Sequence, residues 1–474
     1  MKLQHYILSE AQEQIKQWKQ YVKSNRMLSS AVKVLQKIDK AGYKAWVVGG
    51  AVRDIILGDK IKDVDIATNC PLVILGKIWK LYDIGRSKEF GIVVVIEGGN
   101  TFEVAGLRKD GKYENGRRPE TVSFDVTIED DLGRRDITIN SMAIDKDGNI
   151  IDKFSGRRDI KNKIIRTVGD PRERFGEDYL RMMRVPRFSS KLDFDIEKET
   201  EKYIQRMSIN ITKLTPERLK DELLKAASQS GDKFAKYIQV LDKLKLLRCI
   251  LPEVLNLKYF KESPKFHPET IGKGGTVYSH TLEALKQIGA DKPIEMLATL
   301  LHDIGKGVTL NYQEGLPRYL RHAEEGIKLV NNIADRLKMS NKEREALLFG
   351  VGQHMKFNDI LKMKPSKIAK LVNDENWDVL LAVAQADEFS RGEVYMKRKE
   401  FEETVDKAIK IKEKYNTKEV EKRMKLVDGH HVMELLGITP GPRVGEVIRK
   451  VTDWILDNDI QDQEEIDQYI KSLV

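Results

Sequence analysis

The chain has 474 residues, enough for about three domains, and its 33% charged and 41% hydrophobic content is typical of soluble globular proteins. Its two cysteines, Cys70 and Cys249, exclude a disulfide-stapled fold and favour a reducing cytoplasm, and the sequence offers neither a signal peptide nor the ~20 consecutive apolar residues that span a bilayer. The net charge of +9 favours a polyanionic partner.

The expected elements divide the chain into five segments of an α+β protein. Apolar residues at helical spacing predict a helical appendage over residues 1–28. Strands and helices mix over residues 29–168, which form a head with a mixed sheet. Helical periodicity then predicts a neck over 169–262, a further domain over 263–405 and a tail over 406–474. The boundary near 263 rests on a looser stretch, residues 261–276, with three glycines and two prolines.

The first motif of the head is a strand over residues 45–48, a Gly49-Gly50 turn, a short helix and a second strand carrying Asp63 and Asp65. Side chains at i and i+2 of a strand project to one face, so the two carboxylates can converge on one metal site. The glycines let backbone N–H groups approach a triphosphate, and hard carboxylate oxygens suit Mg²⁺. This layout is typical of two-metal nucleotidyl transfer.

Three more motifs follow in order, at residues 134–143, 174–184 and 215–219. With them, residues 29 to about 260 resemble the bacterial class II tRNA nucleotidyltransferases (CCA-adding enzymes) and their poly(A) polymerase relatives. The resemblance implies a nucleotidyltransferase-type head that adds the 3′-terminal CCA of tRNA from CTP and ATP, with Mg²⁺ and release of pyrophosphate. Glu103, on a predicted strand, is the candidate for a third catalytic carboxylate beside Asp63 and Asp65, although a strand residue in a salt bridge fits it about equally.

The same resemblance implies a set of nucleotide-binding residues in the head and neck. Asp178 and Arg181 are expected to share one face of a helix and to read the base in place of a template. The complete-looking loop over residues 107–119 favours an enzyme that can add the terminal adenosine. The implied nucleotide-binding residues are Gly49, Gly50, Arg53, Asp54, Arg134, Arg135, Asp136, Asn140, Asp178, Arg181, Arg184 and Arg187.

A second site is expected in the domain over residues 263–405. His302 and Asp303 end an apolar helix, and further histidines and an aspartate lie in predicted helices or at their ends. Imidazoles and carboxylates together bind a divalent transition metal or Mg²⁺. The set resembles the HD phosphohydrolase superfamily: His280, His302, Asp303 and Asp387 match its core ligands, and His322 and His354 would complete a second metal position.

Alternatives remain within and outside this family. A poly(A) polymerase shares every head motif, and a partial enzyme would add only CC or only A. An HD phosphohydrolase whose head has become an RNA-binding module is the alternative from another class. The helical tail over 406–474 is expected to bind tRNA, because closely spaced glycines at 437–445 expose backbone N–H groups to phosphate, although a plain helix connection fits them equally.

Overall fold

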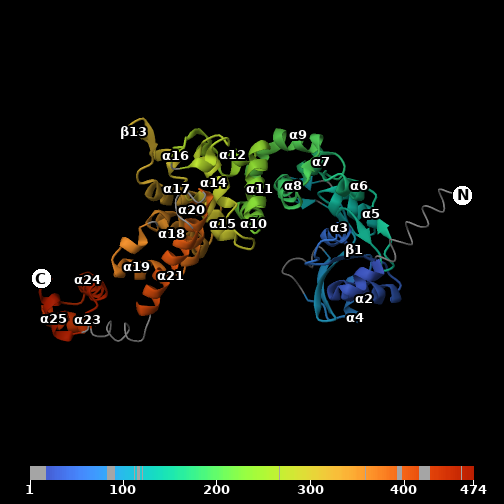
Figure 1. Cartoon of the computed structure of the whole chain (residues 1–474). Helices are drawn as coiled ribbons and strands as arrows, with labels where there is room; N and C mark the ends of the chain where they lie inside the picture. Colours follow the sequence, from blue (N-terminus) through green and yellow to red (C-terminus); the bar gives the residue numbers. More distant parts are fainter. Residues whose placement is uncertain are drawn as a thin grey trace. The chain divides into compact units, whose positions relative to one another are not determined.

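The computed structural model of the chain describes residues 18–82, 91–111, 113–114, 118–119, 121–265, 267–357, 359–391, 398–415, 427–460 and 462–473 (Figure 1). It contains two compact units. The first comprises Met1–Arg218 and Tyr237–Ile250, and the second comprises Leu219–Lys236 and Leu251–Val474. Among the described residues, no helix combines the length and hydropathy needed to cross a bilayer.

A six-stranded mixed sheet forms the centre of the first unit, as expected for an α+β head. The strand order is β10-β9-β1-β2-β4-β3, with β2 and β4 parallel and the other neighbours antiparallel. All four residues of β1 are buried, so it is a central strand that can present its carboxyl end to a site. The strands are β1 (Ala45–Val48), β2 (Asp65–Thr68), β3 (Ile92–Glu97), β4 (Asn100–Gly106), β9 (Ala143–Ile144) and β10 (Ile150–Ile151).

Helix α2 (Arg26–Lys40) packs on β1, β3 and β4 through buried apolar residues that include Leu28, Leu35 and Ile38. The Asn25 side chain caps its first turn by accepting a hydrogen bond from the Leu28 N–H at 2.9 Å. The expected boundary between appendage and head, at residue 28, therefore falls inside α2. Residues 18–24 are helical, and residues 1–17 of the expected appendage lie outside the described part of the chain.

The rest of the first unit consists of short strands and helices. In the loop over 107–119, Tyr113–Glu114 pairs with Arg118–Pro119, and Lys109–Asp110 pairs with Val122–Ser123 just beyond the loop. Residues 112 and 115–117 lie outside the described residues. The remaining elements are α3 (Gly50–Leu57), α4 (Leu72–Ile78), β5 (Lys109–Asp110), β6 (Tyr113–Glu114), β7 (Arg118–Pro119), β8 (Val122–Ser123), α5 (Ile128–Gly133), η2 (Thr138–Asn140), α6 (Gly156–Lys161), β11 (Ile164–Ile165), α7 (Pro171–Glu177), α8 (Arg181–Leu192), β12 (Asp195–Ile196), α9 (Lys198–Met207), η3 (Ser208–Lys213) and α12 (Leu247–Ile250).

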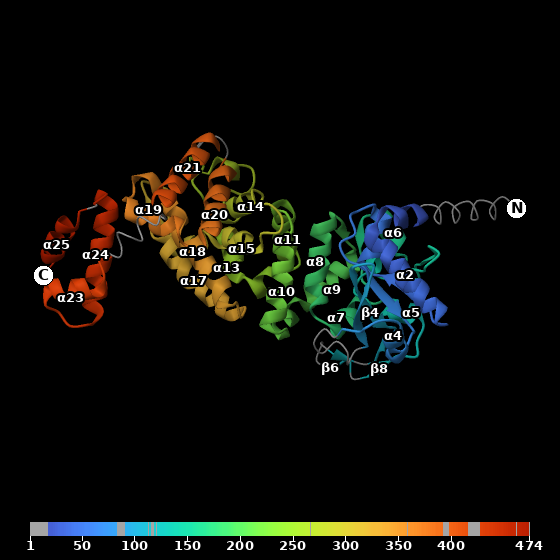
Figure 2. The ribbon, with the colours of Figure 1, turned by 90° about the horizontal axis from the view of Figure 1, so that it is seen from below.

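Helices dominate the second unit, and five of them pack together as a bundle (Figures 1 and 2). These are α14 (Val277–Leu285), α15 (Pro293–Leu301), α17 (His322–Arg336), α18 (Asn341–Phe357) and α20 (Trp377–Ser390). The other elements are α10 (Pro216–Ala227) and α11 (Gly231–Lys243), which cross the unit boundaries, and α13 (Pro252–Asn256), η4 (Leu257–Tyr259), η5 (Pro268–Thr270), α16 (Lys306–Thr309), β13 (Asn311–Gln313), β14 (Leu316–Arg318), η6 (Ile360–Lys362), α19 (Pro365–Val372), α21 (Arg398–Tyr415), α23 (Gly429–Leu436), α24 (Pro442–Asn458) and α25 (Gln463–Lys471).

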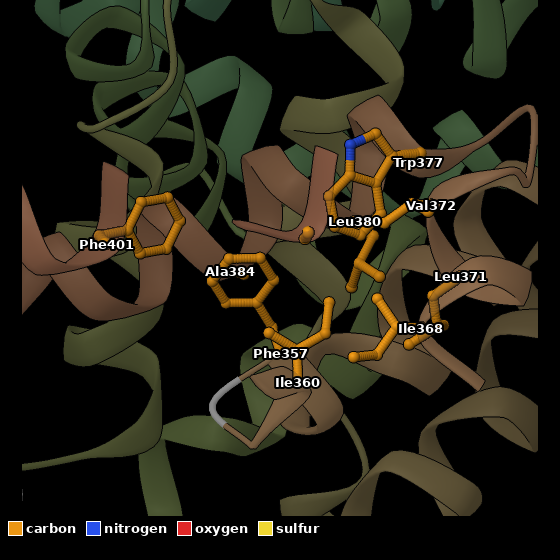
Figure 3. Packing of buried hydrophobic residues seen from close by; sticks show 10 residues of the cluster. Phe357, Ile360, Ile368, Leu371, Val372, Trp377, Leu380, Ala384 and Phe401 are labelled. Atoms are coloured by element: carbon orange, nitrogen blue, oxygen red, sulfur yellow. The ribbon is translucent and has the colours of Figure 1, made fainter. Parts of the chain in front are cut away.

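Two apolar clusters extend this bundle toward the C-terminus. Phe357, Trp377 and Phe401 anchor the first, and the rings of Phe357 and Phe401 stack with centroids 4.8 Å apart (Figure 3). The second joins α23, α24 and α25 through buried side chains such as Val451 and Ile466 (Figure 2). Each cluster replaces exposed apolar surface with packed contacts, which stabilises the fold by about 25 cal/mol per Å² buried.

Gly231 is a position where the packing of the second unit tolerates no side chain. Its N–H donates to the Ile288 carbonyl at 2.9 Å, and an added Cβ would lie 1.8 Å from the Leu285 carbonyl oxygen. We expect Gly231→Ala to lower the free energy of unfolding by about 1–3 kcal/mol because the backbone must move apart. Urea unfolding followed by circular dichroism measures this.

Gly289→Ala is the matched control, because nothing lies within 4 Å of a Cβ added at Gly289. That variant should unfold at the parent's urea concentration or slightly above it. An unchanged midpoint for Gly231→Ala would contradict the close approach of α11 to the end of α14.

Candidate functional site

An open cavity of about 520 Å³ in the first unit collects most of the residues expected at the nucleotide site. The cavity opens beside the end of β1, the start of β2 and helices α3 and α8. The predicted residues that line it are Gly49, Gly50, Arg53, Asp54, Asp63, Asp65, Arg135, Asp136, Asn140 and Arg184. Glu103, Arg134, Asp178, Arg181 and Arg187 are not among the lining residues.

Three carboxylates meet at the start of β2. Asp65 is the first residue of that strand, Asp63 precedes it by two positions, and Glu103 lies on the adjacent parallel strand β4. Partial burial raises the pKa of Asp65, and the negative charges of Asp63 and Glu103 raise it further, while Arg135 opposes them. Carboxylates that repel one another in this way fit a divalent cation, which would relieve the repulsion.

The glycine turn brings backbone close to this acidic group. Gly49 has φ +75°, a conformation that favours glycine, and a Cβ there would lie 2.8 Å from Nη1 of Arg135 and 3.9 Å from Oδ2 of Asp65. Gly49 therefore leaves room for a guanidinium beside the carboxylates. Helix α3 begins immediately after Gly49, so the free N–H groups of the first turn of α3 face the same cavity.

Arg53 is buried and held on three sides. Its guanidinium donates to Oδ1 of Asn140 at 2.7 Å and to Oδ1 of Asp54 at 2.8 Å, and it lies 5.4 Å from the centre of the Phe188 ring. These contacts tie α3, the short helix η2 and α8 into one wall of the cavity. Arg184, also on α8, donates to Oδ2 of Asp136 at 2.7 Å.

Charge pairing also fixes the state of Asp136. Burial raises the pKa of its carboxyl, but the guanidinium of Arg184 more than offsets this and holds the pKa below its ordinary value. Asp136 also accepts a hydrogen bond from the Ile137 N–H at 2.9 Å. The carboxylate is therefore ionised and positions Arg184 at the cavity wall.

The prediction that Asp178 and Arg181 share one helix is wrong. Helix α7 ends at Glu177, Asp178 is extended (φ −149°, ψ 108°), and α8 begins only at Arg181. Asp178 instead accepts hydrogen bonds from Arg218 at 3.0 and 2.8 Å. Arg181 pairs with Glu177.

Two backbone contacts complete the environment of Arg181. Its guanidinium donates to the carbonyls of Arg174 and Arg134, each at 2.9 Å. Arg134 in turn forms an ion pair with Asp131 at 2.7 Å. Arg134 and Arg181 thus stabilise the junction between the sheet and α8. Neither of them lines the cavity.

Sequence reasoning missed several lining residues, among them Lys60, Lys62, Phe188 and Lys191. Burial lowers the pKa of Lys191, and the nearby charge of Arg53 lowers it further. Among the described residues Lys191 forms no ion pair, since Asp54 pairs with Arg53 instead. Phe188 also faces Arg187, whose guanidinium lies 4.6 Å from its ring.

A second cluster of polar residues lies inside the helical bundle of the second unit. Its six members come from α14, α15 and the turn after it, α17, α18 and α20, and all are buried. Their ligand atoms form two groups within 4.8 Å: His280, His302 and Asp387 in one, and Asp303, His322 and His354 in the other. The structure therefore brings together all six residues that the sequence singles out in this domain.

Asp303 lies between the two groups. Its Oδ2 is 3.1 Å from Nε2 of His302 and 3.6 Å from Nε2 of His280, and its Oδ1 is 3.3 Å from Nε2 of His322. Nε2 of His280 is also 3.0 Å from Oδ1 of Asp387. One carboxylate thus faces both groups with separate oxygens.

The imidazoles are oriented by their other nitrogens. Nδ1 of His302, His322 and His354 lies 2.7–2.8 Å from the carbonyl oxygen three residues earlier, so each Nδ1–H donates there and Nε2 is the nitrogen that faces the cluster. Nε2 of His280 and His302 is buried without a hydrogen-bond partner. Such orphaned nitrogens, aimed at carboxylates, fit a divalent metal ion.

The protonation states of His354 and Asp303 agree with ligand chemistry. Burial lowers the pKa of His354 to about 3, so that imidazole is neutral. Burial raises the pKa of Asp303, but the charges of His302 and Lys306 outweigh it and hold the pKa well below its usual value. A neutral imidazole and an ionised carboxylate are the forms that bind metals. Burial lowers the pKa of His280, but the carboxylates of Asp387 and Glu269 outweigh it and raise the pKa to about 9, so that a metal bound there would displace a proton.

Comparison with known proteins assigns family models to three parts of the chain. Residues 45–166 match the "Poly A polymerase head domain", residues 193–257 the "Probable RNA and SrmB- binding site of polymerase A", and residues 276–392 the "HD domain". The first match contains every residue that lines the acidic cavity except Arg184, Phe188 and Lys191, and the third contains the buried histidine cluster.

Curated relatives carry the name CCA-adding enzyme. The chain is 43% identical over 202 residues to that of Bacillus pumilus (42% of this chain, 50% of the relative) and 46% identical over 196 residues to that of Ligilactobacillus salivarius (41% and 48%). The chain thus spans about half the length of the curated relatives that it matches.

Solved structures agree over nearly the full chain. The Bacillus stearothermophilus CCA-adding enzyme in complex with CTP matches with a TM-score of 0.71 and 25% identity over 95% of this chain and 98% of its own. The Thermotoga maritima CCA-adding enzyme complexed with tRNA, at a TM-score of 0.54 and 20% identity over 95% and 96%, shares the fold. The chain therefore contains a poly(A) polymerase-type head, an RNA-binding segment of the same kind and an HD domain, and it shares the fold of the CCA-adding enzymes.

Proposed function

We propose that the chain is a template-independent nucleotidyltransferase that builds or repairs the 3′-terminal CCA of tRNA from CTP and ATP, releasing pyrophosphate. The observation that carries this proposal is the acidic cavity, in which Asp63 and Asp65 lie beside the Gly49 turn and a wall of arginines. The names of the relatives and the CTP complex of the similar structure support the choice of substrates. A cytoplasmic location stays a prediction.

The carboxylates would hold the metal in this reaction. Asp63 and Asp65, with Glu103 behind them, would bind Mg²⁺, which lowers the pKa of the attacking 3′-hydroxyl and neutralises charge on the leaving pyrophosphate. Gly49 and Gly50 would offer N–H groups to the triphosphate.

The arginines and Asn140 would orient the nucleotide. Arg135 lies beside the carboxylates and suits phosphate oxygens, whereas Arg53 sets the orientation of the Asn140 amide toward a ribose. Arg184 and Arg187 would add phosphate contacts along α8.

Asp178 and Arg181 remain our candidates for reading the base, in a changed arrangement. Asp178 accepts two hydrogen bonds from one guanidinium nitrogen of Arg218 and a third from the Leu180 N–H at 3.0 Å, and these fix the direction of the carboxylate. Asp178 has extended backbone at the junction of α7 and α8. An acceptor and a donor held at such a junction can imitate the pairing edge of a base.

Extension of defined tRNA ends tests the main proposal. Transcripts ending at the discriminator base, at C and at CC are incubated with Mg²⁺ and labelled CTP or ATP. We expect ordered addition of two C and one A by the parent. Asp63→Asn combined with Asp65→Asn should lose at least about a hundredfold in rate, because several kcal/mol of transition-state stabilisation disappear.

Asp147→Asn, an exposed carboxylate of the same unit, is the matched control and should retain the parental rate. Products that stop at CC, or that gain A alone, would mean a partial enzyme, and long A tracts without C would mean a poly(A) polymerase. Absence of incorporation by the parent would overturn the transferase proposal.

Lys191 supports a phosphate-rich ligand and gives a second prediction. A half-buried cation among Arg53, Arg187 and Lys62 is destabilised unless an anion neutralises it. We expect Lys191→Met to raise KM for CTP and ATP about tenfold, the loss of one charge-assisted hydrogen bond, with little change in kcat. Lys191→Arg should restore most of the affinity. Steady-state kinetics measure both constants, with Lys202→Met, an exposed lysine of α9, as control.

The buried histidine cluster favours a second activity. We infer that the HD domain hydrolyses phosphoesters, because two groups of imidazoles and carboxylates lie together in a buried site and the Asp303 carboxylate faces both of them. A divalent transition metal or Mg²⁺ bound there would activate water for attack on phosphorus. The chemistry fits an RNA 3′ end that carries a phosphate and has to be trimmed before nucleotides are added.

Hydrolysis of an RNA ending in a 2′,3′-cyclic phosphate tests this activity, with Mg²⁺, Mn²⁺, Co²⁺ or Ni²⁺ supplied separately. We expect turnover with at least one metal, and its loss in Asp303→Asn, since one ligand group loses a member and the other loses the carboxylate oxygen that faces it. Nucleotide addition by that variant should persist. Hydrolysis that survives Asp303→Asn, or that fails only when Asp63 and Asp65 are replaced, would contradict the assignment.

A further inference from the structure

The stretch over residues 261–276, which in sequence resembles a linker, contributes buried charge to the bundle. Glu262 and His267 are 6% exposed, and the Glu269 side chain is 7% exposed. Short-range bonds fix the segment, since the Thr270 hydroxyl donates to the His267 carbonyl at 2.9 Å and Thr276 caps α14. None of these side chains belongs to the two groups that contain Asp303 and Asp387.

The buried side chains close a ring of ion pairs with the cluster. Nζ of Lys306 lies 2.8 Å from Oδ2 of Asp303 and 2.7 Å from Oε1 of Glu262. The other oxygen of Glu262 is 3.4 Å from Nε2 of His267, whose Nδ1 is 3.1 Å from Oε1 of Glu269. Each carboxylate of this ring, Asp303, Glu262 and Glu269, therefore has a lysine or histidine nitrogen beside it.

His280 completes the ring, and it differs from the other three histidines. Its Nδ1 lies 2.8 Å from Oε1 of Glu269, whereas Nδ1 of His302, His322 and His354 faces a backbone carbonyl of its own chain segment. A carboxylate that accepts Nδ1–H fixes the tautomer and makes Nε2 a better electron donor than a carbonyl does. Nε2 of His280 is the nitrogen that faces Asp303 and Asp387.

We propose that Glu269 is a positioning residue of the HD centre, which holds His280 with Nε2 directed at a bound divalent metal, and that the 262–269 segment thereby belongs to the metal site. The inference rests on the proposed metal-dependent function of this domain. Glu269 does not bind the metal itself. It acts through His280, while His267 and Glu262 hold Glu269 and Lys306 in turn.

Binding of Co²⁺ tests the inference without relying on catalysis. The full chain carrying Asp63→Asn and Asp65→Asn serves as background, so that the head carboxylates do not contribute. We expect Glu269→Gln to weaken Co²⁺ binding about 10–100-fold, as measured by titration calorimetry. The visible d–d spectrum should change as well, because the His280 ring is no longer held in one orientation.

Glu283→Gln is the matched control, since Glu283 lies on α14, one turn from His280, and pairs with Lys273 and Lys286 at the surface. It should bind Co²⁺ with the parental affinity and spectrum. Unfolding midpoints with and without Co²⁺ separate positioning from folding: Glu269→Gln should reduce the upward shift that Co²⁺ produces, and Glu269→Asp should recover part of it. Nucleotide addition in the otherwise unaltered chain should be unaffected by Glu269→Gln.

Equal affinity and an identical spectrum for Glu269→Gln and the parent would overturn the role of Glu269. Co²⁺ binding by the parent that is insensitive to Asp303→Asn would overturn the HD metal site as a whole, and the inference with it. The two failures are distinguished by the Asp303→Asn variant alone.

Discussion

The electrostatic cost of burying charged groups governs the second unit, since six ligands and their supporting residues lie inside a helical bundle. An isolated ionised carboxylate in such an interior would be strongly destabilising. The bundle avoids this by alternating signs, with Lys306 between Asp303 and Glu262, and Arg391 on Asp387 at 2.6 Å. The helices can therefore pack closely around groups that would otherwise be exposed.

Burying charged groups is also costly in the first unit, but positive and negative groups are balanced differently there. There Arg53 pairs with Asp54 and Arg184 with Asp136, whereas Asp63 and Asp65 form no ion pair within the described part of the chain. Lys191 lies near other positive charges in the same cavity, so positive charge is in excess around it. An acidic corner beside a basic wall is suited to a ligand that carries both a cation and phosphates.

Local sequence signals were sufficient for much of the architecture. The Gly49-Gly50 turn after an apolar strand gave the start of α3, because few other residues adopt the backbone that Gly49 requires. All six residues of the HD cluster could be named before the fold was known. The names came from family resemblance, however, and periodicity alone would not have grouped them.

Contacts between segments that are far apart in the sequence could not be predicted from the sequence. Asp178 pairs with Arg218, which lies forty positions later in the sequence. This tertiary contact takes the place of the expected pairing along one helix, and α7 ends just before Asp178. Glu262, His267 and Glu269 follow no helical or strand period, and the glycines and prolines around them indicated only a loop. Lys191 follows Arg184 and Arg187 on α8, but only the tertiary fold shows that it faces the cavity.

The position of Asp303 makes the two halves of the HD centre interdependent. The two oxygens of Asp303 face different ligand groups. A cation bound in one half would therefore draw electron density from the carboxylate and change how strongly its other oxygen attracts a cation in the second half. The occupancies of the halves are then thermodynamically linked, and linkage is reciprocal. Loading of this centre is therefore described by two unequal macroscopic constants that belong to the pair, as in the titration of coupled acids.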